Sequence, residues 1–475
     1  MLAFSTVLFD ISKSMNVNFL TLNAWTGLWT AAFLLLAAFF DLNRFMKHAT
    51  RFTDEIFALL IATIFIVDAL GSPFSPVGIY WYFNEDHKSH DVHEENEEYS
   101  YTSAAFLSLI LCIGTTYLAF QLRAIKFAPY FPNQTVRDTV ADFSVVISIL
   151  VWCLVANFLF ANVPVERLNV PDAIAPTQIC CTEDCLTSFP QDCPEIEPFG
   201  RRSWLVSLTA VNGKPWVPFF AAIPAMLAFI LVFLDDGITW HLINHADNKL
   251  THGQAYNWDT VIIAGMVAVN SMVGLPWLVA ATVRSLTHVN ALAERTESGK
   301  IVSVQETRLT HLGIHVLVLI SLFVLNVLKV IPVPVLYGVF LFMGLASLKA
   351  NQFFQRFLMF FMQPEKFPAE PHTKHMDTRR MHMFTAIQIA CYVTLIVFRS
   401  IKAIAIAFPI IIKLCIPIRM FILPKIFTNE ELVLIDTDGG TVAEYLEYKQ
   451  TKFNSPVTTT DIKNVEETAR DDDLA

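Results

Sequence analysis

The stretch LPWLVAATVRSLTHVNAL, residues 275–292, places Arg284 directly behind a run as apolar as a membrane span. A charge at the centre of a helix in lipid costs about 2.5 to 3.5 kcal/mol on insertion scales. Gly274 and Pro276 interrupt the preceding apolar run, and Pro276 suits the first turn of a new helix because its missing N–H needs no partner there. The sequence therefore predicts a helix that starts inside the membrane, with Arg284 about two turns from its start.

The polar residues of this stretch favour anion binding. A helix N-terminus exposes unpaired N–H groups and the positive end of the backbone dipole, and helices that start at membrane depth mark the sites of secondary transporters. Arg284 adds a permanent charge on a planar fork that matches planar oxyanions such as bicarbonate. Ser285, Thr287, His288 and Asn290 make the rest of the helix too polar to face lipid. The alternative interpretation is an arginine that snorkels to the cytoplasmic interface.

The composition is that of a membrane protein with several spans. Of the 475 residues, 54% are hydrophobic and 16% are charged, and the mean hydropathy is positive. Long apolar runs cross a bilayer as helices, whereas a membrane barrel shows short alternating segments. No basic, aromatic-interleaved segment indicates nucleic-acid binding. We therefore predict an all-α polytopic protein with spans at about 23–41, 55–71, 103–121, 140–162, 217–242, 259–273, 275–290, 310–330, 333–348, 382–399 and 402–423.

The distribution of Lys and Arg predicts the orientation. These residues gather in three loops, at 42–52, 122–139 and 349–381. Short loops rich in Lys and Arg stay in the cytoplasm, so alternation of the spans places residues 72–102 and 163–216 outside. We expect a multi-pass protein of the plasma membrane with a cytoplasmic C-terminus.

The eight cysteines fall into two sets. Four lie in the second outer loop, where an oxidising environment permits disulfides; four free thiols are the alternative, and the sequence does not fix the pairing. These are Cys180, Cys181, Cys185 and Cys193. The other four lie in spans and are expected to act as packing residues: Cys112, Cys153, Cys391 and Cys415.

A second polar constellation lies in ILVFLDDGITWHL, residues 230–242. Asp235 and Thr239 are four residues apart and share a helix face, whereas Asp236 points about 100° away. A carboxylate with a hydroxyl one turn further along could be a sodium ligand, a proton acceptor or the counter-ion of Arg284. Two interfacial acids near a helix end are the alternative.

Two further segments are acidic. The outer loop carries seven acids between Glu85 and Glu98, together with His87, His90 and His93. We interpret it as a solvated loop and predict no metal site there, although divalent-metal binding or pH sensing is the alternative. Residues 428–475 are predicted to be a disordered cytoplasmic tail. No nucleotide-binding loop, Walker motif or catalytic triad is found, so we predict neither a pump driven by ATP nor an enzyme, and no cofactor.

Four motifs, GLPWLVAATVRSLTHVNAL, TRFTDEIFALLIATIFI, IPVPVLYGVFLFMGLASL and RRMHMFTAIQIAC, resemble the bicarbonate transporter family. This family includes the red-cell anion exchanger and the sodium-coupled bicarbonate cotransporters. The resemblance covers about residues 20–427. It implies an inverted-repeat fold of fourteen membrane segments with a core and a gate domain. It also implies homodimers, and an elevator-like movement of the core while substrate lies between two facing half-helices.

The resemblance also implies site residues. Arg284 is similar to the exchangers, whereas Asp235 is similar to the cotransporters. Asp235 and Thr239 would help to coordinate the anion and, in a cotransporter, sodium. The residues that would contact the anion are Ala281, Thr282, Val283 and Arg284.

The match begins near the family's fourth membrane segment. About eleven of the fourteen segments are therefore expected in a membrane domain at residues 1–427, without the first half-helix, and the chain alone is expected to transport poorly. The leading prediction is exchange of bicarbonate for chloride across the bilayer. The alternatives are sodium-coupled bicarbonate cotransport, borate export, and a non-transporting membrane scaffold or dimer partner.

Overall fold

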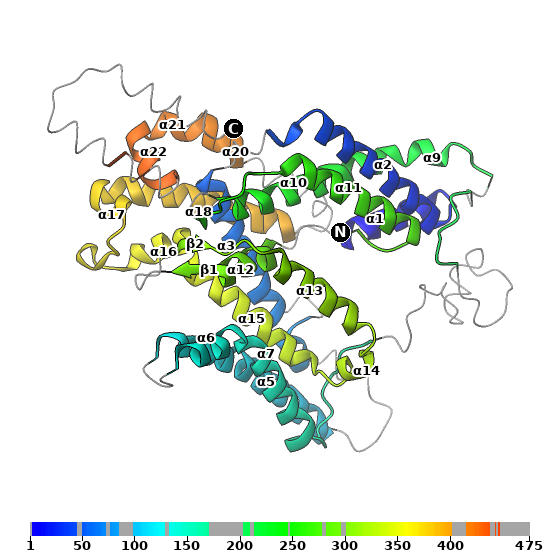
Figure 1. Cartoon of the computed structure of the whole chain (residues 1–475), viewed down its shortest axis with the longest axis horizontal. Helices are drawn as coiled ribbons and strands as arrows, with labels where there is room; N and C mark the ends of the chain where they lie inside the picture. Colours follow the sequence, from blue (N-terminus) through cyan, green and yellow to red (C-terminus); the bar gives the residue numbers. More distant parts are fainter. Residues whose placement is uncertain are drawn as a thin grey trace.

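The computed structural model shows an almost entirely helical chain with one two-stranded hairpin (Figure 1). The acidic histidine loop and the four cysteines of the second outer loop lie outside the described residues, so the predictions made for them stay predictions. The described residues are 2–44, 50–72, 77–84, 98–128, 133–170, 203–209, 213–245, 248–277, 282–295, 301–400, 415–437, 442 and 445–446.

Helix α2 (Phe19–Phe39) is the centre of a first helix group, because α10 (Ala222–Ile243) and α11 (Tyr256–Val273) pack along it. Gly27 permits this close approach: a Cβ at that position would lie 1.7 Å from the hydroxyl oxygen of Ser271 on α11. The Asn43 amide, just after α2, donates to Asn257 and Thr260 at 2.8 and 2.9 Å. The group also contains α1 (Leu2–Ser14), α9 (Val217–Phe220) and α12 (Thr282–Leu292).

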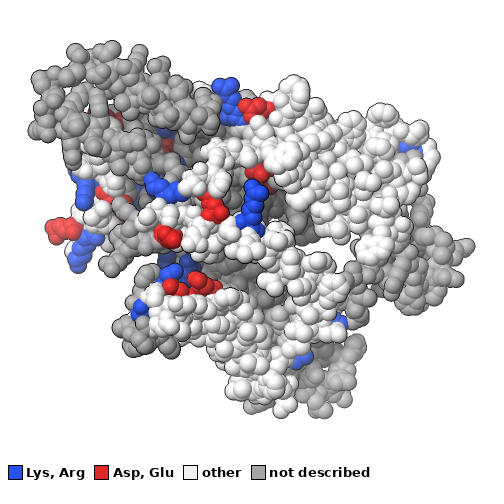
Figure 2. All heavy atoms as spheres, in the orientation of Figure 1, with Lys and Arg blue, Asp and Glu red and all other residues white. Residues whose placement is uncertain are grey.

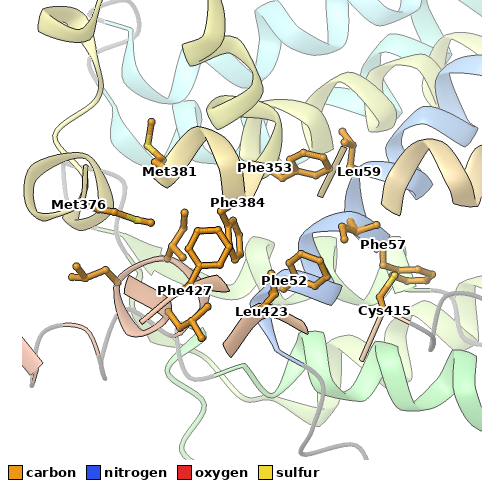
Figure 3. Close-up of a cluster of buried hydrophobic side chains, with 14 of the residues drawn as sticks. Phe52, Phe57, Leu59, Phe353, Met376, Met381, Phe384, Cys415, Leu423 and Phe427 are labelled. Atoms are coloured by element: carbon orange, nitrogen blue, oxygen red, sulfur yellow. The ribbon is translucent and has the colours of Figure 1, made fainter. Parts of the chain in front are cut away.

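A second helix group is built around α3 (Arg51–Leu70) and α15 (Val333–Ala350), which pack along each other. Its apolar core includes Phe52, Phe353 and Phe384, which converge from α3, α16 and α18 (Figure 3). The other elements of this group are η2 (Ile79–Phe83), α5 (Glu98–Ala124), η3 (Ile125–Phe127), α6 (Gln134–Asp142), α7 (Ser144–Leu154), the π-helical η4 (Val155–Leu159), α16 (Gln352–Leu358), η6 (Met359–Phe361), η7 (Pro364–Lys366), α17 (Pro371–His375) and α18 (Thr378–Ser400).

The four cysteines predicted to lie in spans are free thiols that pack in the second helix group. Cys112 and Cys415 are buried in its apolar clusters, and Cys153 and Cys391 pack against such clusters. Their role as packing residues is therefore confirmed.

After α12 the chain forms a hairpin of β1 (Ala293–Arg295) and β2 (Ile301–Val304), followed by α13 (Arg308–Ser321) and α14 (Leu325–Leu328). The span predicted at 310–330 is thus broken at residues 322–324, where the backbone turns. No residue of α13 is buried, although the helix is apolar.

Within the described residues, four helices are long and apolar enough to cross a membrane, and six if each bent pair counts as one span. One bent pair joins α6 to α7 and η4 at 65°, and the other joins α15 to α16 and η6 at 73°. Figure 2 shows few charged side chains over the outer end of the first helix group, as lipid contact requires. The helical membrane-protein class is confirmed apart from the short hairpin, and the inverted repeats and the number of segments stay predictions.

A buried ion pair joins α3 and α16, and Gln388 of α18 is hydrogen-bonded to both partners. Both terminal nitrogens of Arg356 face the carboxylate of Glu55, and Arg356 Nη2 donates to Gln388 Oε1 at 2.9 Å. Gln388 Nε2 and Arg51 Nε lie 3.1 and 3.2 Å from the two oxygens of the same carboxylate. This cluster connects the short helix after the bend to the start of α3, which lies 301 positions earlier in the chain.

The C-terminal segment corrects one prediction. It contains α20 (Cys415–Pro417), η9 (Ile418–Ile422), α21 (Leu423–Ile426) and α22 (Asn429–Asp436). Thr428 and Glu431 cap α22 reciprocally, and the buried Asp436 carboxylate accepts from the Phe52 N–H at 2.6 Å and pairs with Arg419 at 2.7 Å. The predicted disorder from residue 428 is therefore wrong for α22, because apolar residues and one buried carboxylate dock it on α3.

Candidate functional site

The chain breaks between α11 and α12 as predicted, but Pro276 has a different place. Gly274 ends α11 in the left-handed conformation, at φ 73° and ψ 28°, which favours glycine. Leu275, Pro276 and Trp277 lie outside any helix. Pro276 therefore precedes the new helix and does not occupy its first turn, so that expectation is wrong.

A buried tryptophan anchors this break. Trp277 is 5% exposed, and its indole Nε1 donates to the Ser271 hydroxyl, which in turn donates to the Val267 carbonyl at 2.6 Å. Since Gly27 on α2 leaves room for both side chains, the break is held against the centre of the first helix group. The packing therefore fixes where the chain enters α12.

Arg284 is the third residue of α12 as described, and its side chain is exposed. Its charge adds to the positive end of the helix dipole in the first turn. Of the other predicted anion contacts, Thr282 and Val283 begin α12, whereas Ala281 lies outside the described residues. An exposed guanidinium beside a helix N-terminus in a chain of apolar helices is able to bind a small oxyanion.

Helix α12 packs against α10, so the structure brings Arg284 and the α10 acids into neighbouring elements. Asp235 is partly buried, and Asp236 and Thr239 are 3% and 4% exposed. The Thr239 hydroxyl donates to the Asp235 carbonyl oxygen at 3.0 Å, which confirms their place on one helix face. Among ion pairs of the described residues, none joins Arg284 to Asp235 or Asp236, and the sodium-ligand, proton-acceptor and counter-ion roles stay predictions.

The end of α10 also meets the second helix group, through residues that the sequence analysis did not single out. His241 Nε2 lies 3.1 Å from Asp54 Oδ2 of α3, and Asp54 is 5% exposed. One turn earlier, Ile238 is buried in the apolar core around Phe52. Within the described part of the chain, this is the one pairing of a basic side chain with a carboxylate that joins the two groups. The available signal was an acid directly before the predicted span that begins at residue 55, and a histidine two residues after Thr239.

Comparison with known proteins adds to this geometry. A family model described as the HCO3- transporter integral membrane domain matches residues 1–101 and 78–439. The chain belongs to the bicarbonate transporter family. Its members in this comparison are 31–33% identical and carry different names.

Three members of the family illustrate the different transport activities that the names of these relatives state. Band 3 anion transport protein of Rattus norvegicus is 33% identical over 450 residues, 93% of this chain and 46% of its own length. The sodium-driven chloride bicarbonate exchanger of Bos taurus is 33% identical, over 92% of this chain and 42% of its own length. The electrogenic sodium bicarbonate cotransporter 4 of Mus musculus is 32% identical over the same shares. The chain thus spans about half the length of the curated relatives it matches.

Proposed function

We propose that this protein is a secondary transporter that exchanges bicarbonate for another inorganic anion, chloride first. The observation that carries the proposal is Arg284, an exposed guanidinium in the first turn of a helix that begins after a break in the apolar chain. The described residues of this region hold no other permanent positive charge on α10, α11 or α12. Bicarbonate is a planar oxyanion, and the guanidinium fork matches its geometry. The names of the relatives, which include an anion transport protein and bicarbonate exchangers, support the same substrate class.

We propose that the first helix group is the moving core and the second is the gate. Each group packs mainly within itself, and α10 and α12 of the proposed core carry the candidate anion site. Movement of one group past the other must break the ion pair of Asp54 with His241 and withdraw Ile238 from the apolar cluster. These contacts would therefore stabilise one of the two end states. The homodimer, the plasma membrane and the cytoplasmic C-terminus belong to the same proposal.

Sodium-coupled bicarbonate cotransport is the second candidate. Asp235, Asp236 and Thr239 provide oxygen atoms on α10, and hard cations prefer oxygen ligands. Arg284 on the neighbouring helix opposes a cation at the same place, because two positive charges repel. For this reason we rank exchange before cotransport, with borate export or a non-transporting scaffold after them.

Recovery of internal pH in vesicles or cells that contain the chain tests this proposal. After an acid load in bicarbonate buffer, recovery should depend on a chloride gradient and should continue when external sodium is replaced by an organic cation. Recovery that stops without sodium and is indifferent to chloride would favour cotransport. No bicarbonate-dependent recovery under either condition, at confirmed surface expression, would favour the scaffold.

A further inference from the structure

Three histidines lie where α12 meets α13. The ring centroids of His288 and His311 are 4.5 Å apart, and the Thr310 hydroxyl oxygen is 3.2 Å from His288 Nε2. His288 follows Arg284 by four residues, and His315 follows His311 by four, so each pair shares one helix face. Both helices lead away from the same hairpin, which is closed by the Gln305 N–H on the Leu292 carbonyl oxygen at 3.0 Å (Figure 1). Arg284 and His315 therefore each lie one turn further from the hairpin than the histidine contact.

Hydrogen bonds to the backbone fix the tautomers of the two histidines on α13. His311 Nδ1 lies 3.0 Å from the Thr307 carbonyl oxygen, and His315 Nδ1 lies 2.8 Å from the His311 carbonyl oxygen. Since a carbonyl oxygen only accepts, each Nδ1 carries the proton and Nε2 is the basic nitrogen. Both side chains are exposed. Each imidazole can take up a proton at Nε2 without losing its backbone hydrogen bond, and it then becomes a charged donor.

The surroundings of these histidines argue against a purely structural role. Helix α13 is apolar and none of its residues is buried, so its stability does not depend on packed histidines. Polar side chains on an apolar membrane helix face protein or water and mark functional sites. A polar surface therefore continues from Arg284 along a row of three histidines, His288, His311 and His315.

The charges around the row link proton uptake to anion binding. Arg284 on α12 and Arg308 at the start of α13 are permanent cations, and both oppose a further positive charge on the row. Two acids on neighbouring elements already have other partners: the Glu294 carboxylate on β1 accepts from Ser303 and Gln305, and Glu306 binds Thr251 and His252. The other acids are Asp235 and Asp236 on α10. Two imidazoles in contact also resist double protonation. An anion bound beside the two rings offsets this repulsion, so proton and anion bind together more readily than either does alone.

We propose that His288, His311 and His315 form a second subsite for a small oxyanion, filled when the row carries a proton, next to the Arg284 site. This inference rests on the proposed function, because Arg284 is taken as the neighbouring anion site. The row then takes up one proton with one anion, so that the charge of the occupied subsite is balanced. Exchange through this protein would accordingly become faster as the pH falls on the side of the membrane from which the row takes up its proton.

Nitrate binding to the purified full chain tests the subsite, since nitrate is a planar oxyanion whose charge does not change with pH. Calorimetric titration at pH 6 and pH 8 should show affinity about tenfold higher at pH 6, with a proton taken up on binding. The His288→Gln/His311→Gln/His315→Gln variant should lose this difference and keep its affinity at pH 8. His375→Gln, at an exposed histidine on α17, is the matched control and should behave as the wild type.

The outcomes separate the two proposals. An unchanged ratio of affinities between pH 6 and pH 8 in the triple variant would overturn the subsite and leave the proposed function standing. If nitrate binding at pH 8 survives Arg284→Ala, the proposed function fails at its central residue. In that case the subsite still stands if the difference in affinity between pH 6 and pH 8 is lost when the three histidines are replaced.

Discussion

Replacing Glu55 by Gln removes the carboxylate that faces the guanidinium of Arg356. Arg356 is fully buried, so the variant leaves a charge without a counter-ion in the core of the second helix group. Removing one partner of a buried pair costs about 3–5 kcal/mol. Only neutral amide oxygens, such as Gln388 Oε1 at 2.9 Å from Arg356 Nη2, then remain to accept from the guanidinium. Because they do not compensate its charge, we expect the loss of stability for Glu55→Gln near the upper end of this range.

The reverse substitution should cost less. In Arg356→Met the Glu55 carboxylate keeps Arg51 Nε at 3.2 Å and Gln388 Nε2 at 3.1 Å, so part of its charge stays compensated. We expect a loss near the lower end, about 3 kcal/mol. The double variant Glu55→Gln/Arg356→Met has no uncompensated charge from the pair, and it should recover about 2 kcal/mol relative to Glu55→Gln alone.

Denaturation in mixed micelles with increasing sodium dodecyl sulfate, followed by tryptophan fluorescence, measures these free energies of unfolding. Arg379→Met, at an exposed arginine on α18, is the control and should change the midpoint little. A double variant whose loss equals the sum of the two single losses would refute the coupling, and with it the account of Glu55 and Arg356 as one unit.

Three other predictions follow from particular contacts. Asp54→Asn weakens the ion pair with His241 that joins the helix groups, so exchange rates should change by severalfold while the half-saturating anion concentration stays the same; a change in that concentration alone would contradict the role. Burial lowers the pKa of His372 from 6.5 to about 4, so between these values the unfolded chain binds more protons and stability rises with pH; in His372→Phe this rise, at most about 3 kcal/mol, should be absent from melting curves at pH 4.5 and pH 7. Gly27→Ala forces a Cβ into α11 and should cost about 1–3 kcal/mol, whereas Gly265→Ala, on the open side of α11, should not destabilise; equal melting temperatures would contradict the packing argument.

Much of the fold follows from patterns that are local in sequence. Apolar runs predicted α2, α5, α10 and α18, because hydropathy over about 20 residues reports membrane burial. Gly274 predicted the end of α11, because a left-handed residue after a helix favours glycine. Pro276 gave a wrong prediction of the first helical turn, because proline fits equally well in the non-helical stretch that Trp277 anchors.

The parts that sequence reasoning missed depend on distant partners. Glu55 begins a predicted span and Asp54 directly precedes it, yet their partners come from α16 and α10. Helix α22 was predicted to be part of a disordered tail, because its stability comes from docking on α3 and not from its own composition. Asp235, Thr239 and Arg284 were found because each departs from an apolar run, and their role as an anion site remains the proposal to be tested.

The concentration dependence of anion flux through Arg284 variants tests the central claim most directly. Flux would be measured in vesicles at equal protein density for the wild type, Arg284→Ala, Arg284→Lys and the control Arg379→Ala. Since a charge-assisted contact is worth roughly 1.5 to 3 kcal/mol, Arg284→Ala should raise the half-saturating bicarbonate concentration about ten- to a hundredfold, and Lys should rescue only part of this loss. An unchanged half-saturating concentration in Arg284→Ala, or full rescue by Lys, would contradict the account.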